Sequence, residues 1–577
     1  MDIDAPPQYT AEQAQTATFA QVATKVTQFI GEPDTLRETL EAFRAFLTSI
    51  ENVTLSKNQL QTLKVQGVSV IEEAANHLKE GGNLSEILPQ LSNIFTTVAH
   101  RLESSTKWEV VLQEQGGLEQ LYAVIDAACE GLDQVHTSIS HMRDNLESAT
   151  KKNELLIARK KDQQKLAELQ AVFEQTSQGD SLTTRAQQSI NRNLKIIGDP
   201  TVAQPHQDAK RALAVVAELT GQSLPASTVL GKDFVTIGQH AIHQGTSYDI
   251  YEGEYFTGEK IAIKKLRHRV DELTARKTHE RFARQALNWS MLRHDAILTF
   301  YGMGVEPAPT APEEFQMYMV SPFLQNRDAK TYLTKYNEVP PLSRLQIISD
   351  VARGLKYLHE DVDLGQGVHG IVHSGLDIHN VLIKDSGRAV ISGFSHTKKI
   401  IAGDLQESFT GDNTNYRYMG PELMQDEPHV TFGTDIYSWA MTSLEILTDI
   451  PPFGVKTRGP KIIQLVASGQ TPKRGDHPKI EEYHPHSNEL WALFEQCWNP
   501  IPQARPSADT LTQHLKPMIR QFGKKSDPAV QQPTQPSGKG PATVESAPAM
   551  KPIVRSPTPP PNPPNPPNPP NPPPPAA

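Results

Sequence analysis

The feature that most constrains the fold is a series of short sequence blocks between Asp233 and Phe522. In order along the chain they read IAIKKLR, HERFARQALNWSMLRHDAILTFYG, VHGIVHSGLDIHNVLI, ISGFSHT, RYMGPEL, TDIYSWAM and CWNPIPQARPSADTL. One short block is weak evidence, but several blocks in one order are improbable by chance. We therefore expect residues 233–522 to form one mixed domain of strands and helices.

Residues 1–150 are predicted to form a helical bundle. Apolar residues recur there at alternating spacings of three and four, which place them on one face of a helix. The clearest stripe runs from Leu118 to Leu146, on what we expect to be one long helix. Three further stripes cover residues 36–50, 60–78 and 84–102. Four helices with one apolar face each bury those faces by packing together.

Residues 151–232 are predicted to connect the bundle to the mixed domain. Residues 151–173 carry many charges and only a thin apolar stripe, which is typical of an exposed helix. Such a helix would brace the bundle against the domain that follows. We interpret the polar stretch from Ser177 to about Gln207 as linker, and residues 209–220 as one more short helix.

Residues 523–577 form a proline-rich tail. Positions 528–577 hold 20 of the 45 prolines of the chain, so this segment cannot bury enough apolar surface to fold. Its NPP repeat has the three-residue period of polyproline II. Two interpretations stay open: a solubilising spacer, or a ligand for an aromatic-lined groove of the SH3 or WW type.

The blocks between Asp233 and Phe522 resemble a protein kinase domain of the tyrosine-kinase-like group, of the fungal type. IAIKKLR is similar to the strand that ends in the phosphate-pairing lysine, here Lys264, and VHGIVHSGLDIHNVLI is similar to the catalytic loop. ISGFSHT stands at the metal-binding motif and RYMGPEL at the end of the activation segment. The resemblance implies an α+β chain: an all-α N-terminal bundle, a two-lobed kinase fold at 233–522 and a disordered tail.

The catalytic loop lacks its proton acceptor. In the kinase family, H-R-D-x-x-x-x-N supplies an aspartate that accepts the proton of the substrate hydroxyl and an asparagine that binds magnesium. The asparagine is Asn380 here, and counting back five residues reaches Gly375. Asp377 stands where the family usually has lysine, and its spacing from Asn380 does not fit the missing aspartate.

Two further elements of the chemistry are altered. The metal-binding motif D-F-G reads Gly393, Phe394 and Ser395. Magnesium normally uses one or two carboxylates together with phosphate oxygens, so Asn380 alone is a poor cation site. The helix residue that should pair with the lysine is Gln285 instead of glutamate, which leaves at best a hydrogen bond. These losses predict a pseudokinase with no intact catalytic residue and no metal site.

Nucleotide binding is predicted to be weakened. The glycine-rich loop at positions 243–248 keeps only its middle glycine, and Tyr248 is expected to hinder the approach of the backbone to phosphates or to fill that space. We expect no required cofactor, with weak, metal-independent ATP binding left open. The residues left to hold a nucleotide are Gly245, Lys264, Ser321, Leu324 and Asn380.

The residues that support the kinase architecture are retained. Glu422 and Arg505 match the pair that ties the activation segment to the lower lobe, and Asp435 matches the residue that supports the catalytic loop. His373 and Phe394 keep their places in the two catalytic motifs. Retained architecture with lost chemistry is typical of a fold kept for binding.

Charge and cysteine content limit the partners and the compartment. A net charge of −10 and a pI near 6.1 argue against a nucleic-acid binder, because neutralising phosphates requires a basic surface. The two cysteines exclude a disulfide framework and fit a reducing cytosol. The first ten residues lack the pattern of a secretion signal, and no apolar run reaches membrane-spanning length. A cytoplasmic location is expected, with membrane recruitment left open.

The order of bundle, charged helix and pseudokinase resembles the mixed-lineage kinase domain-like family, which executes necroptosis. The resemblance implies an upstream kinase that phosphorylates the activation segment, and a released bundle that self-associates at a membrane. The switch sites would be Ser408, Thr410, Thr414 and Tyr416. The connecting helix would meet anionic lipid, or alternatively present a solvated face, through Lys151, Lys152, Arg159, Lys160, Lys161 and Lys165.

Three functions stay open from the sequence. The favoured one is a pseudokinase that switches the bundle in response to phosphorylation or a ligand. The second is a weakly active ATP-dependent serine/threonine kinase, which Lys264 and Asn380 leave open. The third is a passive scaffold that joins a self-associating bundle to partners of the tail. Phosphate transfer that depends on Lys264 would separate the second function from the other two.

Overall fold

A computed structural model describes residues 34–79, 83–104, 107–140, 145–198, 203–225, 228–245, 248–267, 282–308, 311–336, 339–362, 367–401, 407–408 and 415–521. All of these lie in one compact unit, residues 1–524. The proline-rich tail predicted for 523–577 lies outside the described residues.

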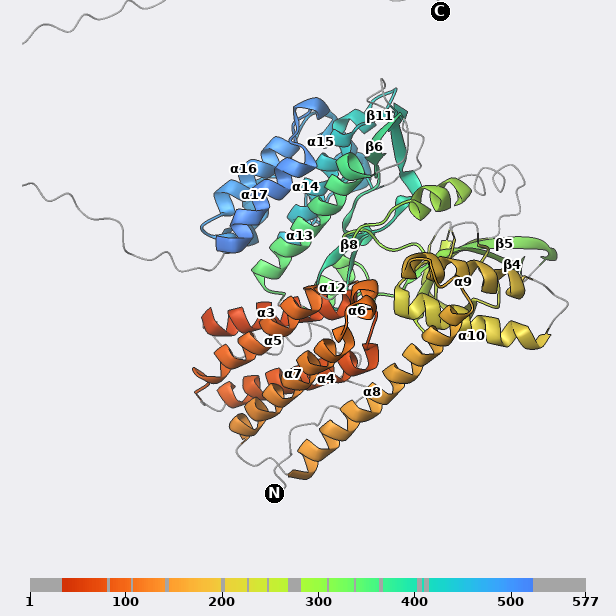
Figure 1. The fold of residues 1–577 in the computed structure, drawn as a ribbon. Coiled ribbons are helices and arrows are strands. Elements are labelled where there is room, and N and C mark those ends of the chain that lie inside the picture. Colours follow the sequence, from red (N-terminus) through yellow and green to blue (C-terminus); the bar gives the residue numbers. More distant parts are fainter. Residues whose placement is uncertain are drawn as a thin grey trace, which may run out of the picture. The chain divides into compact units, whose positions relative to one another are not determined.

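The N-terminal bundle contains the four helices that the apolar stripes predict (Figure 1). Phe43 and Phe95 lie at its centre with ring centroids 5.0 Å apart, and Phe46 packs against both. A short fifth helix, α6 (Trp108–Gln113), spans less than two turns and was not predicted. The four main helices are α3 (Asp34–Asn52), α4 (Lys57–Lys79), α5 (Ile87–Ser104) and α7 (Gly117–Ser140).

The stripe from Leu118 to Leu146 is not one helix, as predicted, but belongs to two. Helix α7 ends at Ser140 and α8 (Asn145–Glu174) begins soon after, so Leu146 lies on the next helix and the expected domain boundary at 150 falls within α8. Apolar spacing alone could not reveal the break, because the stripe continues in phase across it. The stripe on α7 is buried inside the bundle.

The connecting region is more helical than predicted. Two helices follow α8, namely α9 (Leu182–Ile197) and α10 (Ala203–Thr220). The interpretation of this stretch as linker is therefore wrong for residues 182–197. Ser181 caps α9 by accepting a hydrogen bond from the Thr184 amide, and Ala186 and Ile190 are fully buried. The many polar residues on the outer face of α9 concealed this short stripe.

A five-stranded antiparallel sheet forms the smaller lobe of the mixed domain, in the order β1-β2-β3-β5-β4. Helical residues 282–290 lie between β3 and β4 in the chain. Buried side chains of the sheet, including Ile263 and Val320, belong to one continuous apolar core with α10 and the bundle. The strands are β1 (Val235–Gln244), β2 (Tyr248–Tyr255), β3 (Lys260–Leu266), β4 (Gly302–Ala308) and β5 (Ala311–Pro322).

The larger lobe is mainly helical and has its own apolar core around α14. The fully buried Trp439 at the middle of α14 donates a hydrogen bond to the Ile348 carbonyl of α13 at 3.0 Å. Its helices are α12 (Ala329–Lys335), α13 (Pro341–Lys356), α14 (Phe432–Thr448), α15 (Gly459–Ala467), α16 (Ser487–Cys497) and α17 (Ala508–Gln521). An N-terminal helical region followed by a two-lobed α+β domain confirms the predicted fold class.

The short strands of the larger lobe form three two-stranded sheets. Strand β6 (Val368–Val372) pairs with β9 (Lys398–Ile401), and β7 (Val381–Ile383) pairs with β8 (Ala389–Ile391). Strand β10 (Glu407–Ser408) pairs with β11 (His429–Val430). The loops that join these strands carry the candidate site.

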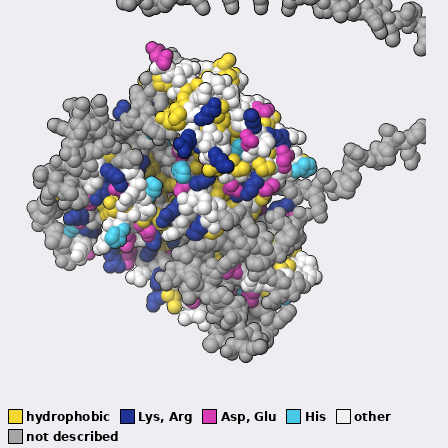
Figure 2. All heavy atoms as spheres, turned by 180° about the vertical axis from the view of Figure 1, so that it is seen from behind, with side chains coloured by type: hydrophobic (Ala, Val, Ile, Leu, Met, Phe, Trp, Pro, Cys, Tyr) yellow, Lys and Arg dark blue, Asp and Glu magenta, His cyan; other side chains and the backbone are white. Residues whose placement is uncertain are grey.

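Within the described ranges, every helix is too short or too polar to cross a membrane. Where Figure 2 colours the side chains, lysine and arginine lie among aspartate and glutamate. This mixed surface agrees with the low net charge of the chain.

Candidate functional site

The predicted catalytic loop runs between β6 and β7 and is held by a buried carboxylate of α14. Asp435 is fully buried and accepts hydrogen bonds from the His373 amide at 2.7 Å and the Ser374 amide at 2.8 Å. His359 contacts the same carboxylate through Nε2 at 2.9 Å. A charged acceptor of two backbone amides fixes the loop firmly, because hydrogen bonds to an ionised group are stronger than neutral ones.

Asn380 lies between the two positions that lack a carboxylate. Its Nδ2 donates to the Gly375 carbonyl oxygen at 2.7 Å. Gly393 has a left-handed backbone with φ of 84°, and a Cβ added there would lie 2.1 Å from Oδ1 of Asn380. A side chain at 393 would therefore require Asn380 to move. The amide of Asn380 thus fills the space that a side chain at 393 would need.

The side chains present do not fit a magnesium ion. Magnesium needs hard oxygen ligands in octahedral geometry, usually including a carboxylate. Neither 375 nor 393 supplies one, and the Asn380 amide is bonded within the loop. Among the described residues, no group of three or more His, Cys, Asp and Glu side chains could hold a metal.

Asp377 has a structural role in this arrangement. Its Oδ1 accepts from the amides of His379 at 2.8 Å and Asn380 at 3.0 Å, and its Oδ2 accepts from Asn415 Nδ2 at 2.6 Å. Desolvation by burial raises the pKa of this carboxyl group. Asp377 thus caps the turn at residues 378–380 and ties the catalytic loop to the activation segment.

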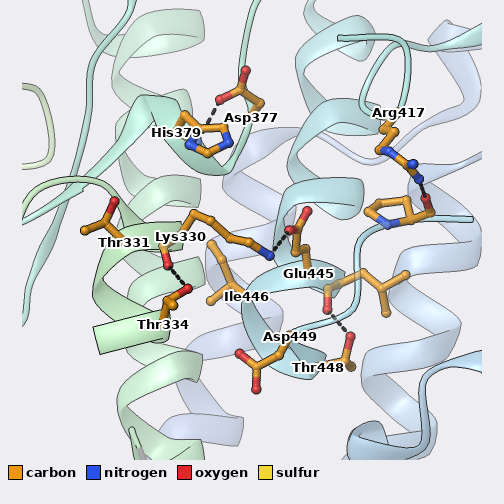
Figure 3. Close-up of polar contacts among 12 residues, drawn as sticks. Lys330, Thr331, Thr334, Asp377, His379, Arg417, Glu445, Ile446, Thr448 and Asp449 are labelled. Carbon is orange, nitrogen blue, oxygen red and sulfur yellow. Dashed lines mark hydrogen bonds and ion pairs between the residues drawn. The ribbon is translucent and has the colours of Figure 1, made fainter. Parts of the chain in front are cut away.

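Polar contacts fix the surface beside this loop (Figure 3). Lys330 of α12 points toward Glu445 of α14, with Nζ 2.7 Å from Oε1, and Tyr418 donates to the other carboxylate oxygen. Arg417 donates to the Pro452 carbonyl at 2.7 Å. Glu445 is buried, so its two partners compensate a charge that would otherwise be costly. The end of the activation segment is therefore bound to the larger lobe.

Lys264 lies on β3 without an acidic partner among the described residues. Its Nζ is 4.4 Å from the centre of the Tyr248 ring, and that ring lies 6.3 Å from the Phe282 ring. Gln285 is buried, and its Oε1 has no hydrogen-bond partner within the described ranges. Desolvation lowers the pKa of Lys264 to about 8. An aromatic contact thus replaces the ion pair that the family uses.

The other nucleotide-binding candidates surround this lysine. The Gly245 amide donates to the Tyr248 carbonyl at 2.9 Å, which closes the turn between β1 and β2. Ser321 lies at the end of β5 and is buried, and Leu324 packs on the core of the larger lobe. The Tyr248 ring thus lies over the Lys264 ammonium group, on the side of the turn between β1 and β2.

A row of aromatic rings connects the two lobes. This row was not predicted from the sequence. The ring centroids are 5.3 Å apart for His373 and Phe394, 5.6 Å for Phe394 and Trp289, and 4.9 Å for Trp289 and Phe300. Trp289 donates to the Leu298 carbonyl at 2.7 Å. The row holds helical residues 282–290 against the metal-binding motif. Trp289 and Phe300 lie in one of the sequence blocks, which was the available signal.

Glu422 and Arg505 form a bidentate ion pair. The distances from the guanidinium nitrogens to the carboxylate oxygens are 2.7 and 2.8 Å, and both residues are buried. Arg505 also donates to the Gly433 carbonyl at 2.9 Å. The pair joins the short helical turn after the activation segment to the segment before α17, and therefore stabilises the larger lobe.

The predicted switch residues lie in different settings. Ser408 is on β10, and Tyr416 packs as a half-buried side chain on a small apolar cluster near β6. Thr410 and Thr414 lie outside the described residues.

The basic residues of α8 divide into two groups. Arg159 binds Asp126 at 2.5 Å and Gln59 at 2.8 Å, and Lys165 binds Glu218 at 2.6 Å. Lys160 and Lys161 are exposed. The paired residues join α8 to the bundle and to α10, so only part of the basic set faces solvent.

Comparison with known proteins gives matches to the second half of the chain. Residues 237–515 match the sequence profile of the protein tyrosine and serine/threonine kinases. Serine/threonine-protein kinase 12 of Arabidopsis thaliana is 26% identical over 291 residues, which are 48% of this chain and 57% of that protein. STY17 of the same plant is 24% identical, covering 48% and 44%. Human TNNI3K is 25% identical, covering 48% and 30%. The matched segment thus spans about half or less of these relatives.

Proposed function

Since residues 237–515 are a protein kinase domain, we propose that this domain transfers no phosphate and instead controls the N-terminal bundle by contact. The observation that carries the proposal is the position of Asn380 between Gly375 and Gly393. Phosphoryl transfer needs a metal ion on the phosphates and a carboxylate at the substrate hydroxyl. Here the Asn380 amide fills the space beside Gly393, and no carboxylate among the described residues replaces the two that are missing.

The setting of Lys264 supports the same proposal. A phosphate-binding lysine acts as a fixed cation, which needs an acidic neighbour to hold it. The Lys264 ammonium lies over an aromatic ring in a desolvated position, and Gln285 offers it no charge. Its lowered pKa leaves it less strongly cationic near neutral pH.

The bundle is the proposed effector. In this proposal phosphorylation of the activation segment, or a ligand, loosens the bundle, which then self-associates and engages anionic lipid in a cell-death response. Because the α7 stripe is buried, self-association would use other surfaces, such as Leu156 and Ile157 on α8, which are 61% and 49% exposed. Lys160 and Lys161 on the same helix are the side chains that would approach lipid.

A thermal unfolding assay with nucleotide tests the loss of the metal site. A ligand present at 100 times its Kd stabilises a protein by about 2.7 kcal/mol, which moves Tm by several degrees. We expect ATP at millimolar concentration to raise Tm of the full chain by less than about 1 °C, and added magnesium to change nothing further.

The control is Tyr248→Ala, which removes the ring from Lys264 and opens the space beside it. If this variant binds ATP without magnesium, the ring blocks the phosphates as proposed. A magnesium-dependent rise of several degrees in the unmodified chain would contradict the proposal, because it requires a cation site that Asn380 cannot supply.

A further inference from the structure

The turn between β7 and β8 makes a set of polar contacts with the bundle. This five-residue turn, residues 384–388, is closed by hydrogen bonds from the Lys384 amide to the Arg388 carbonyl at 2.8 Å and from the Gly387 amide to the Lys384 carbonyl at 2.9 Å. Gly387 has φ of 76°, which suits glycine. We call residues 384–388 the hairpin turn.

Glu51, near the end of α3, clamps the turn with both carboxylate oxygens. Oε1 accepts from the Ser386 amide at 2.8 Å and Oε2 accepts from the Ser386 hydroxyl at 2.9 Å. Ser386 is fully buried. Glu51 as a residue is exposed, yet its carboxylate is enclosed enough for desolvation to raise its pKa. Two hydrogen bonds to one carboxylate define both the position and the orientation of the turn.

Two basic residues of the bundle complete the contact. Arg44, about two turns before Glu51 on the same face of α3, donates from Nη2 to the Gly387 carbonyl at 2.8 Å and is buried. Lys64 of α4 lies with Nζ 3.6 Å from the Asp385 carboxylate. Three consecutive residues of the turn therefore each have a charged partner on the bundle.

The hairpin turn is also bonded to segments that lead to the candidate nucleotide-binding residues. Asn326, two residues after Leu324, donates from Nδ2 to the Lys384 carbonyl at 2.8 Å. Arg388 binds the buried Asp350 of α13 through Nε at 2.7 Å. The strand after the turn leads directly to Gly393. A change in the cleft can thus reach the bundle through few covalent and hydrogen bonds.

The activation segment makes a different set of contacts. Its described residues Asn415 and Arg417 bind the catalytic loop and the loop after α14. The charged contacts described above, in contrast, connect the bundle to the hairpin turn. The geometry therefore favours the hairpin turn as the place where docking of the bundle is decided.

We infer that the hairpin turn at 384–388 is the lock that holds the bundle on the kinase domain, with Glu51, Arg44 and Lys64 as its counterpart. Opening the lock frees α3 and exposes Ser386. The inference deepens the proposed function, since it names the contact that signalling must break. The lock itself does not depend on whether the domain transfers phosphate. Experiments can therefore contradict the lock without contradicting the loss of phosphate transfer, and the reverse.

Amide hydrogen exchange on the full chain tests the lock at Ser386, whose amide is bonded to Glu51. We expect Glu51→Ala to accelerate exchange of the Ser386 amide by roughly tenfold or more, the effect of losing a charged hydrogen bond. Glu38→Ala is the matched control, because Glu38 is exposed on the same helix. It should leave the rate unchanged.

Variants with reversed charges distinguish release of the bundle from the loss of a single hydrogen bond. Asp385→Lys faces Lys64 with a like charge but leaves the Glu51 acceptor intact, so exchange at Ser386, taken relative to the intrinsic rate of the changed sequence, reports undocking. We expect this variant to accelerate exchange several-fold, and the double variant Asp385→Lys with Lys64→Asp to restore much of the protection.

Exchange of the α14 amides reports whether a variant is still folded. If Glu51→Ala accelerates those amides as well, Glu51→Gln decides the question, because it keeps the shape of the side chain and one acceptor. Local acceleration at the turn supports the lock. A Ser386 amide that exchanges at the unmodified rate in Glu51→Ala or Glu51→Gln, or that ignores Asp385→Lys, overturns it.

Discussion

At the scale of single residues, the site carries uncharged side chains at positions where the kinase family has charged ones. Gln285 stands where the ion pair needs an acid, Gly393 stands where a metal needs one, and Tyr248 covers the lysine. The spacing of the motifs was enough to predict which positions lack a carboxylate, whereas the obstruction of phosphates by Tyr248 stays a prediction. It could not predict that Oε1 of Gln285 has no hydrogen-bond partner among the described residues, because that depends on side-chain positions across two elements.

Replacing Lys264 should stabilise the protein at neutral pH. The pKa of Lys264 falls from 10.5 to about 8 in the fold, so the folded state binds its proton less tightly than the unfolded state. Stability therefore rises as pH increases from about 8 toward 10.5, and the charge is unfavourable below that range. We expect Lys264→Met to gain about 1 kcal/mol at pH 7 in urea unfolding, and less at pH 10.

The control for this prediction is Lys260→Met, on the same strand but with an exposed side chain. It should change stability little at either pH. If Lys264→Met proves less stable than the unmodified chain at pH 7, the ammonium–ring contact outweighs the cost of desolvation and our description of the site is wrong.

At the scale of elements, α8 does more than brace the bundle. Asp162 of α8 is buried and caps the start of α4: its carboxylate accepts from the Asn58 amide at 3.1 Å and from the Gln59 amide at 3.0 Å. An acidic side chain at a helix N-terminus satisfies amides that have no partner within the helix. Arg159, one turn earlier, binds Asp126 of α7.

Asp162→Ala should destabilise the chain by about 2 kcal/mol, because two α4 amides lose a charged acceptor. The matched control is Glu154→Ala, an exposed acidic residue on the same helix, which should cost less than about 0.5 kcal/mol. Urea unfolding followed by circular dichroism measures both variants. Equal effects would show that α8 does not cap α4.

Sequence periodicity predicted the elements that carry a full apolar stripe. Helices α3, α4 and α5 follow it closely, whereas α6 is too short to show a period and α9 has a narrow stripe among polar residues. The clamp on the hairpin turn had no signal at all. Glu51 and Ser386 are 335 positions apart, and nothing in either local sequence identifies the partner.

At the scale of the whole molecule, the bundle and the smaller lobe are continuous. Buried residues of α3, α10 and the sheet belong to one apolar core, while α14 organises a second core in the larger lobe. The hairpin turn belongs to the larger lobe, so the bundle contacts both lobes of the kinase domain. Contact of the bundle with both lobes supports the proposed control of the bundle by contact, which needs no phosphate transfer.

The central claim is that the kinase domain has lost phosphate transfer. Transfer from radiolabelled ATP to the chain itself and to a general protein substrate, with magnesium or manganese, measures this directly. The matched variant is Lys264→Met, which removes the last cation of the nucleotide site. We predict that the unmodified chain and Lys264→Met give the same background signal. Transfer by the unmodified chain that Lys264→Met abolishes would contradict the account.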